Sequence, residues 1–275
     1  MKKLILLVLA ISIGIVAVFY SRQQNDQQQQ RLQIPVQPHE SALSDENEEP
    51  SIRFPIPEVQ PQAEEQDTGQ QAETAQPLPP LDLSDGEMQN GLAGLIGMAT
   101  LMKLFNPKDM IRHIVVTIDN LPRSQYAVKY LPTKPVTGQF IVSGKEDHTT
   151  ISMANYQRYT AYVQLVETVD TDALISMYSR LYPLFQQAYE DLGYPSGYFN
   201  DRLIEVMDLM LDTPEVHDPV ELIRPNVLYE YADEELEKLP AGQKILIRMG
   251  NDNAVRVKAK LRELRRGLTA NSLDD

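Results

Sequence analysis

Residues 193–202, with the sequence GYPSGYFNDR, form the most chemically suggestive stretch of the chain. A tight turn of this composition displays aromatic rings beside an acid, an amide and a guanidinium group, which suits stacking on a sugar ring and hydrogen bonding to its hydroxyls. The same residues also suit a corner between two helices, where Tyr194 and Phe199 pack together and Asn200 or Asp201 caps the next helix. The candidate binding residues of this loop are Tyr194, Tyr198, Asn200, Asp201 and Arg202.

Four acidic residues recur at steps of four, three and four in the helix expected over about 200–211: Asp201, Glu205, Asp208 and Asp212. This spacing places them along one helix face. Glycoside hydrolysis requires two carboxyl groups beside the bond that breaks, so this face is a candidate acidic site. A row of acids is also the usual solvated side of an amphipathic helix, and the spacing does not identify a catalytic residue.

The sequence indicates no metal site and no cofactor. It contains no cysteine, and its four histidines, at positions 39, 113, 148 and 217, form no H-x-x-x-H pair. Residues 138–144 lack the nucleophile elbow of a serine hydrolase, and no glycine-rich phosphate loop is found. The formal net charge of -14 disfavours nucleic acid as a partner.

The expected C-terminal helix, over about 252–268, is basic although the rest of the domain is acidic. Its candidate basic surface comprises Arg256, Lys260, Arg262, Arg265 and Arg266, and Lys258 lies among them. One interpretation is that this helix packs into the domain and its bases pair with the domain's own acids, including the acidic face. The alternative is a docking surface for an anionic partner, such as phospholipid headgroups.

An uncharged apolar run, residues 4–20, follows Lys2 and Lys3 near the N-terminus. As a helix it would cover roughly 26 Å, which is enough to cross a membrane with local thinning. Phe19 and Tyr20 stand where a cleaved signal peptide would need small residues, so an uncleaved anchor is favoured over a signal peptide. The lysines predict residues 1–3 in the cytoplasm and the remainder outside it.

Residues 21–80 are rich in Gln, Pro and Glu and show neither helical nor strand periodicity, which predicts a disordered linker. Two short apolar islands interrupt it, at 32–36 (LQIPV) and 52–56 (IRFPI). Each island is suited to docking as an extended peptide in a groove or at a sheet edge. The alternative is that they are scattered apolar residues of a linker.

Residues 81–269 are expected to form a mainly α, compact helical domain with one small β-hairpin, followed by a tail at 270–275. Apolar residues at helical spacing predict helices over about 84–102, 107–121, 153–166, 172–193 and 200–211, besides the C-terminal one. Ser84 and Glu87 have the spacing of a capping box, and Pro183 predicts a kink or restart. The β-branched run 114–118 leaves a strand open as an alternative, and the hairpin is expected over 139–151.

Several segments resemble a bacterial family known as domain of unknown function 3014. They are LPPLDLSD, DNLPR, SRLYPLFQQAYEDLGYPSGYFNDRLIEV, VLYEYAD, GQKILIRMG and NAVRVKAKLRELR, within about residues 78–269. The resemblance implies a single-pass protein of the inner membrane of Gram-negative bacteria, with a Pro-rich spacer and a periplasmic C-terminal domain. It implies no activity and no catalytic residue.

Three functions remain open on these grounds. The leading hypothesis is a membrane-tethered envelope module that binds a protein or cell-wall partner in the periplasm, with the tether raising its local concentration. The second is a periplasmic enzyme that acts on envelope carbohydrate through the acidic helix and the Tyr-rich loop. The third is a protein that binds an anionic lipid or polymer through the C-terminal bases.

Overall fold

The computed structural model describes residues 52–57, 77–124, 128–145 and 148–270. The expected membrane anchor, the cytoplasmic residues before it, most of the linker and nearly all of the C-terminal tail lie outside these ranges. No helix within them has the length and apolar character needed to cross a membrane.

Helices make up most of the described chain, as the sequence predicts. They are η1 (Leu81–Leu83), α2 (Asp85–Ile96), α3 (Met98–Leu104), α4 (Met110–Asn120), η2 (Val128–Tyr130), α5 (Met153–Gln157), α6 (Thr160–Thr168), α7 (Thr171–Asp191), α8 (Phe199–Leu211), α9 (Glu234–Lys238), α10 (Ala241–Arg248) and α11 (Asn251–Leu268). The strands are β1 (Val142–Ser143), β2 (Thr149–Ile151), β3 (Glu221–Ile223) and β4 (Glu230–Tyr231).

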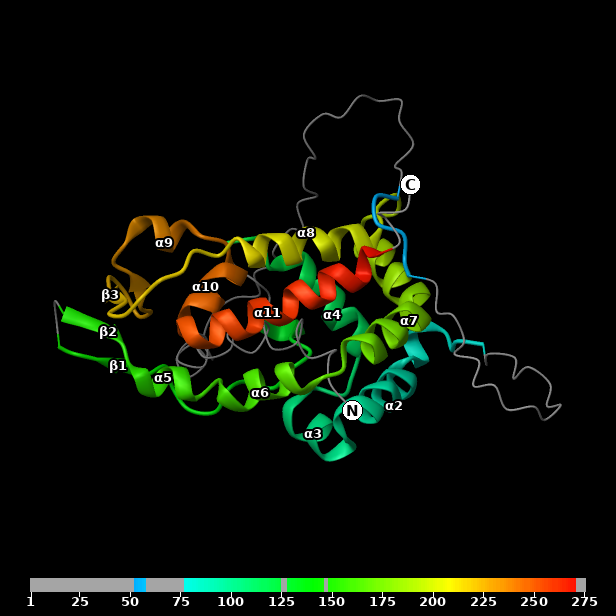
Figure 1. Ribbon diagram of the computed structural model, residues 1–275, viewed down its shortest axis with the longest axis horizontal. Coiled ribbons are helices and arrows are strands. Elements are labelled where there is room, and N and C mark those ends of the chain that lie inside the picture. The colour runs from blue at the N-terminus through cyan, green and yellow to red at the C-terminus, as the bar shows by residue number, and fades with distance from the viewer. Residues whose placement is uncertain (1–51, 58–76, 125–127, 146–147, 271–275) are drawn as a thin grey trace, which may run out of the picture.

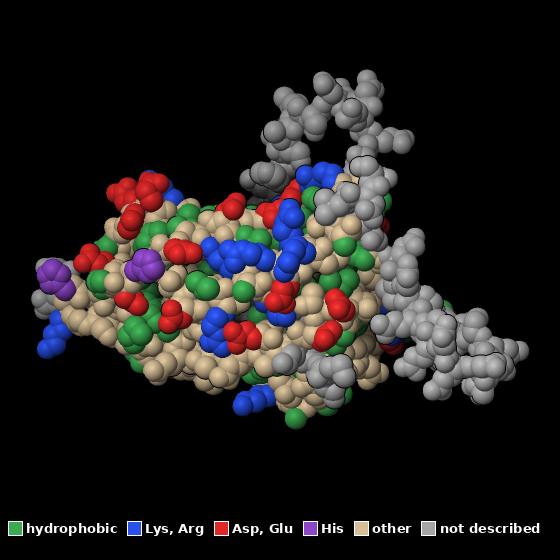
Figure 2. Space-filling model, viewed as in Figure 1, with side chains coloured by type: hydrophobic (Ala, Val, Ile, Leu, Met, Phe, Trp, Pro, Cys, Tyr) green, Lys and Arg blue, Asp and Glu red, His purple; other side chains and the backbone are tan. Residues whose placement is uncertain are grey.

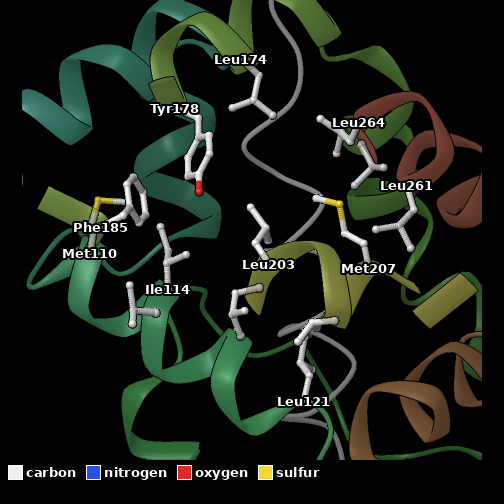
Figure 3. Close-up of a cluster of buried hydrophobic side chains, with 14 of the residues drawn as sticks. Met110, Ile114, Leu121, Leu174, Tyr178, Phe185, Leu203, Met207, Leu261 and Leu264 are labelled. Atoms are coloured by element: carbon white, nitrogen blue, oxygen red, sulfur yellow. The ribbon is translucent and has the colours of Figure 1, made fainter. Parts of the chain in front are cut away.

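Helices α4, α7, α8 and α11 surround the main hydrophobic core, and α8 and α11 lie side by side (Figure 1). Figure 3 shows Ile114, Phe185, Leu203 and Leu264, one from each helix, pointing toward one another. The expected apolar seam of α11 is confirmed, because Val257, Leu261, Leu264 and Leu268 are all buried. The C-terminal helix is therefore part of the core.

The small sheet lies at the opposite end of the domain from α7 (Figure 1). Its strands are antiparallel in the order β1-β2-β3-β4, with Val142 opposite Ile151 and Leu222 opposite Tyr231. The predicted hairpin is confirmed, but the prediction of a single hairpin is wrong. Strands β3 and β4 were not predicted: β3 pairs with β2, which lies far from it in the sequence, so this pairing depends on the fold.

Local hydrogen bonding explains where several helices differ from expectation. The run 114–118 is helical, and α4 begins at Met110 because the Asp85 carboxylate accepts the N–H groups of Asp109 and Met110 at 2.9 and 3.0 Å. The Ser84 capping box is wrong: the Ser84 hydroxyl donates to the Leu81 carbonyl instead. Because Asp85 lies on α2, the start of α4 depends on a contact between two helices.

Two expected helices are interrupted and a third is not. Gly97, at φ 82°, separates α2 from α3, because this left-handed backbone conformation cannot continue a helix. The expected helix over 153–166 is split into α5 and α6. Helix α7 continues through Pro183 for 21 residues, so of the two expected alternatives the restart is wrong, and the kink stays a prediction.

Truncating the α11 seam tests whether the C-terminal helix belongs to the core. We expect Leu261→Ala to lower the free energy of unfolding by about 2–5 kcal/mol, because Leu261 is 1% exposed. Val255→Ala on the same helix is the control, since Val255 is 44% exposed and should cost well under about 1 kcal/mol. Urea unfolding followed by circular dichroism measures both, and equal effects would contradict the packing of α11.

Candidate functional site

Aromatic packing fixes the turn between α7 and α8. The Tyr194 ring stacks on Tyr189 with centroids 4.6 Å apart, and Phe199 stacks on Phe185 at 5.7 Å. Gln186 accepts a hydrogen bond from the Phe199 N–H and donates one to the Gly197 carbonyl, both at 2.8 Å. Tyr194 and Phe199 thus hold a helix corner together, and this part of the structural interpretation is confirmed.

Asn200 and Asp201 do not cap α8, although the sequence suggested that role. Neither is the N-cap residue, because the helix begins at Phe199 and Tyr198 precedes it. Both are nonetheless almost inaccessible, with 1% and 7% of their surface exposed. Buried polar groups need hydrogen-bond partners. The partners of Asn200 and Asp201 therefore show what this end of α8 binds.

The partners are main-chain groups of a distant segment. The Asp201 carboxylate accepts the N–H groups of Phe54 at 2.8 Å and Arg53 at 3.1 Å, one on each oxygen. The Asn200 amide donates to the Phe54 carbonyl at 2.8 Å, while its oxygen accepts from the Tyr178 hydroxyl at 3.2 Å. Two adjacent side chains of α8 therefore bind the backbone of residues 53 and 54.

The side chains of this segment add a second set of contacts. The Arg53 guanidinium forms an ion pair with Glu205, and its Nε lies 3.9 Å from the Asp201 carboxylate. Phe54 and Ile56 are partly buried against the main core. The peptide interpretation of the island at 52–56 is confirmed in that the segment docks beside the start of α8 (the blue segment in Figure 1), but the chain bends at Arg53 and Phe54 and is not extended there. These residues of the expected linker therefore contact the domain.

Arg202 and Tyr194 face a different group. Asp119, 2% exposed at the end of α4, accepts hydrogen bonds from Arg202 at 3.2 Å, Arg123 at 2.7 Å and the Tyr194 hydroxyl at 3.4 Å. A buried carboxylate needs such donors to offset the loss of water. The predicted binding loop is thus divided between the peptide segment and Asp119. Asp119 was not singled out in the sequence, because its partners Tyr194 and Arg202 lie 75 and 83 residues further along the chain.

The predicted acidic face has a different environment at each residue. Asp201 and Glu205 hold the segment, and Glu205 also lies 3.4 Å from Arg202. Asp208 forms an ion pair with Arg265 of α11, and Asp212 directly follows the last residue of α8. The expected pairing of α11 bases with this face is confirmed at Asp208.

Most of the α11 bases serve the domain itself. Arg256 pairs with Glu167, which lowers the pKa of that carboxyl, and Lys260 pairs with Glu263. Lys258 donates to the Thr213 carbonyl, and burial lowers the pKa of its ammonium. Arg262 and Arg266 are exposed, and basic side chains lie along the middle of the face in Figure 2.

A small apolar cavity lies within the main hydrophobic core. Its volume is about 50 Å³, and side chains of α4, α7, α8 and α11 line it, among them Ile114, Leu174 and Leu203. Tyr178 forms part of the wall and also donates to Asn200, so it connects the core to the segment. Among the described residues, no group of three or more His, Asp and Glu is placed to hold a metal ion.

Removing the Asp201 carboxylate tests the docked segment. Asp201→Ala deletes both acceptors, and hydrogen bonds to charged groups contribute about 1.5–3 kcal/mol each, so we expect residues 52–57 to be released. Limited trypsin digestion should then cut the Arg53–Phe54 bond at least about tenfold faster than in the wild type. Asp212→Ala, at the other end of α8, is the control. Equal cutting rates in all three chains would contradict the contact.

Comparison with known proteins gives one match. The family model described as "Protein of unknown function (DUF3014)" matches residues 110–265, which is more than half of the chain. The match spans α4 to most of α11, so it includes Asp119, Asn200 and Asp201 but not the docked segment. No curated protein and no solved structure matches the chain. The chain belongs to the DUF3014 family, as the resemblance predicted.

Proposed function

We propose that this chain is a single-pass protein of the bacterial inner membrane whose periplasmic domain binds a short segment of a protein partner through its main chain. The observation that supports the binding role most directly is the pair Asn200 and Asp201, which hold two successive N–H groups and one carbonyl of residues 53 and 54. Recognition through main-chain groups with side-chain pockets is a recurring mode of peptide binding.

The geometry favours a protein partner over a cell-wall glycan. An ionised carboxylate accepts hydrogen bonds but donates none, and here its two oxygens bind the N–H groups of consecutive peptide units. Glu205 adds a negative charge at the position of the Arg53 side chain. A peptide that carries a cation meets both requirements with one short stretch of chain.

A carbohydrate-active enzyme has less support. Such an enzyme needs two carboxyl groups that face one glycosidic bond, whereas Asp201 and Glu205 both contact residue 53. Asp208, one turn further along, is engaged with Arg265.

The membrane location rests on residues 4–20 and on the two lysines before them. A tethered domain searches only the volume near its anchor, so even modest affinity for a short segment suffices to capture an envelope partner. This argument links the proposed anchor to the proposed peptide site.

The topology is tested by fusing an export-dependent reporter enzyme, such as a phosphatase that folds only outside the cytoplasm, after residue 275. We expect an active reporter in the membrane fraction. The same fusion with residues 4–20 deleted is the control and should be inactive. An active reporter in the deletion, or an inactive one in the intact chain, would contradict the proposed orientation.

Peptide binding is tested with the detergent-solubilised full chain carrying Arg53→Glu and Phe54→Ala, hereafter the vacated variant, which frees the site. A fluorescent peptide of residues 50–59 should bind it saturably, measured by fluorescence anisotropy. Adding Asp201→Ala should weaken binding at least about tenfold, since both main-chain contacts of the carboxylate are lost. Asp212→Ala is the matched control. A folded vacated variant that binds no peptide would refute the binding role.

A further inference from the structure

Residues 52–57 combine contacts that any peptide can make with contacts that select particular side chains. The three main-chain hydrogen bonds at Arg53 and Phe54 require only that neither residue is proline. The ion pair with Glu205 selects a cation at position 53. Burial of part of the Phe54 and Ile56 side chains against the core selects apolar groups at those positions.

Proline occupies two positions of this segment, and neither has an N–H group that the site would need. Pro55 and Pro57 follow Phe54 and Ile56, and each fixes its own backbone φ angle. A segment with fewer rotatable backbone angles loses less conformational entropy on binding. The Arg53 guanidinium also lies 5.9 Å from the Phe54 ring centroid, so the cation and the aromatic ring support each other.

Residues 52–57 belong to the same chain as the site that they occupy, so any partner must compete with them. Residues 58–76 join it to the domain, so it is present at an effective concentration on the order of millimolar. A partner segment that uses Asn200, Asp201 and Glu205 must replace residues 52–57, because the same atoms cannot bind two backbones at once.

We infer that residues 52–57 act as an internal competitor at the peptide site, and that the partner segment carries a basic residue directly before an aromatic one, followed by proline. This inference rests on the proposed peptide-binding function. It adds the sequence class of the partner and the mechanism that keeps the site occupied until a partner arrives.

The competitor is tested by comparing two chains. The fluorescent peptide of residues 50–59 should bind the vacated variant about 10- to 100-fold more tightly than the wild type, because only the wild type must first release its own segment. Arg53→Ala alone, which removes the ion pair and keeps the aromatic ring, should give an intermediate affinity. Circular dichroism and the unfolding midpoint establish that each chain is folded.

The selectivity is tested by reversing one charge on each side of the site. In the vacated variant, the peptide with Arg53→Glu should bind at least about tenfold more weakly than the unaltered peptide. Glu205→Arg combined with Arg53→Ala and Phe54→Ala, which leaves no charge at position 53 of the chain's own segment, should reverse this preference. A peptide with Phe54→Ala should also bind more weakly, whereas Ile52→Ala should have a smaller effect because Ile52 is 52% exposed.

The outcomes separate this inference from the function on which it rests. If wild type and vacated variant bind the peptide equally well, residues 52–57 are not a competitor, although the binding role stands. If the charge reversals leave affinity unchanged, the assigned partner class is wrong. If the folded vacated variant binds no peptide, the proposed function itself fails.

Discussion

A buried carboxylate must be matched by hydrogen-bond donors, and this constraint governs the site at the start of α8. At Asp201 the donors are the N–H groups of Arg53 and Phe54, 148 and 147 residues away along the chain. Because every residue other than proline has a main-chain N–H group whatever its side chain, the carboxylate defines a place for a backbone. Glu205 then adds selectivity for charge.

Helix α8, which carries Asp201, contacts a different element of the domain on each of its sides. Leu203 faces the main core, Arg202 binds Asp119 at the end of α4, and Asp208 pairs with Arg265 of α11. The Tyr178 hydroxyl of α7 donates a hydrogen bond to the side-chain oxygen of Asn200. The peptide site is thus fixed by the core helices, and a rigid support of this kind lowers the entropic cost of binding.

Periodic apolar patterns predicted the long helices well, because residues such as Leu261 must face one side wherever the helix lies. Features that depend on contacts between distant parts of the sequence were harder to predict. Local competition also misled the prediction: the Ser84 capping box had the right spacing, yet the hydroxyl donates to the Leu81 carbonyl, three residues earlier in the chain. The loop at 193–202 was recognised as unusual, but no residue near Asp201 in the sequence indicates which groups donate hydrogen bonds to the Asp201 carboxylate. The sequence did show an apolar island among prolines at 52–56, but the place where this island docks can be known only from the fold.

Amide hydrogen exchange of the full-length wild-type chain tests the central claim most directly, because it reports on the two N–H groups that Asp201 accepts. Hydrogen-bonded amides exchange only when the segment is released, so their protection measures docking. We predict that the Arg53 and Phe54 amides exchange at least about tenfold more slowly than in the free peptide of residues 50–59. Exchange of both amides at the rate of the free peptide would contradict the account.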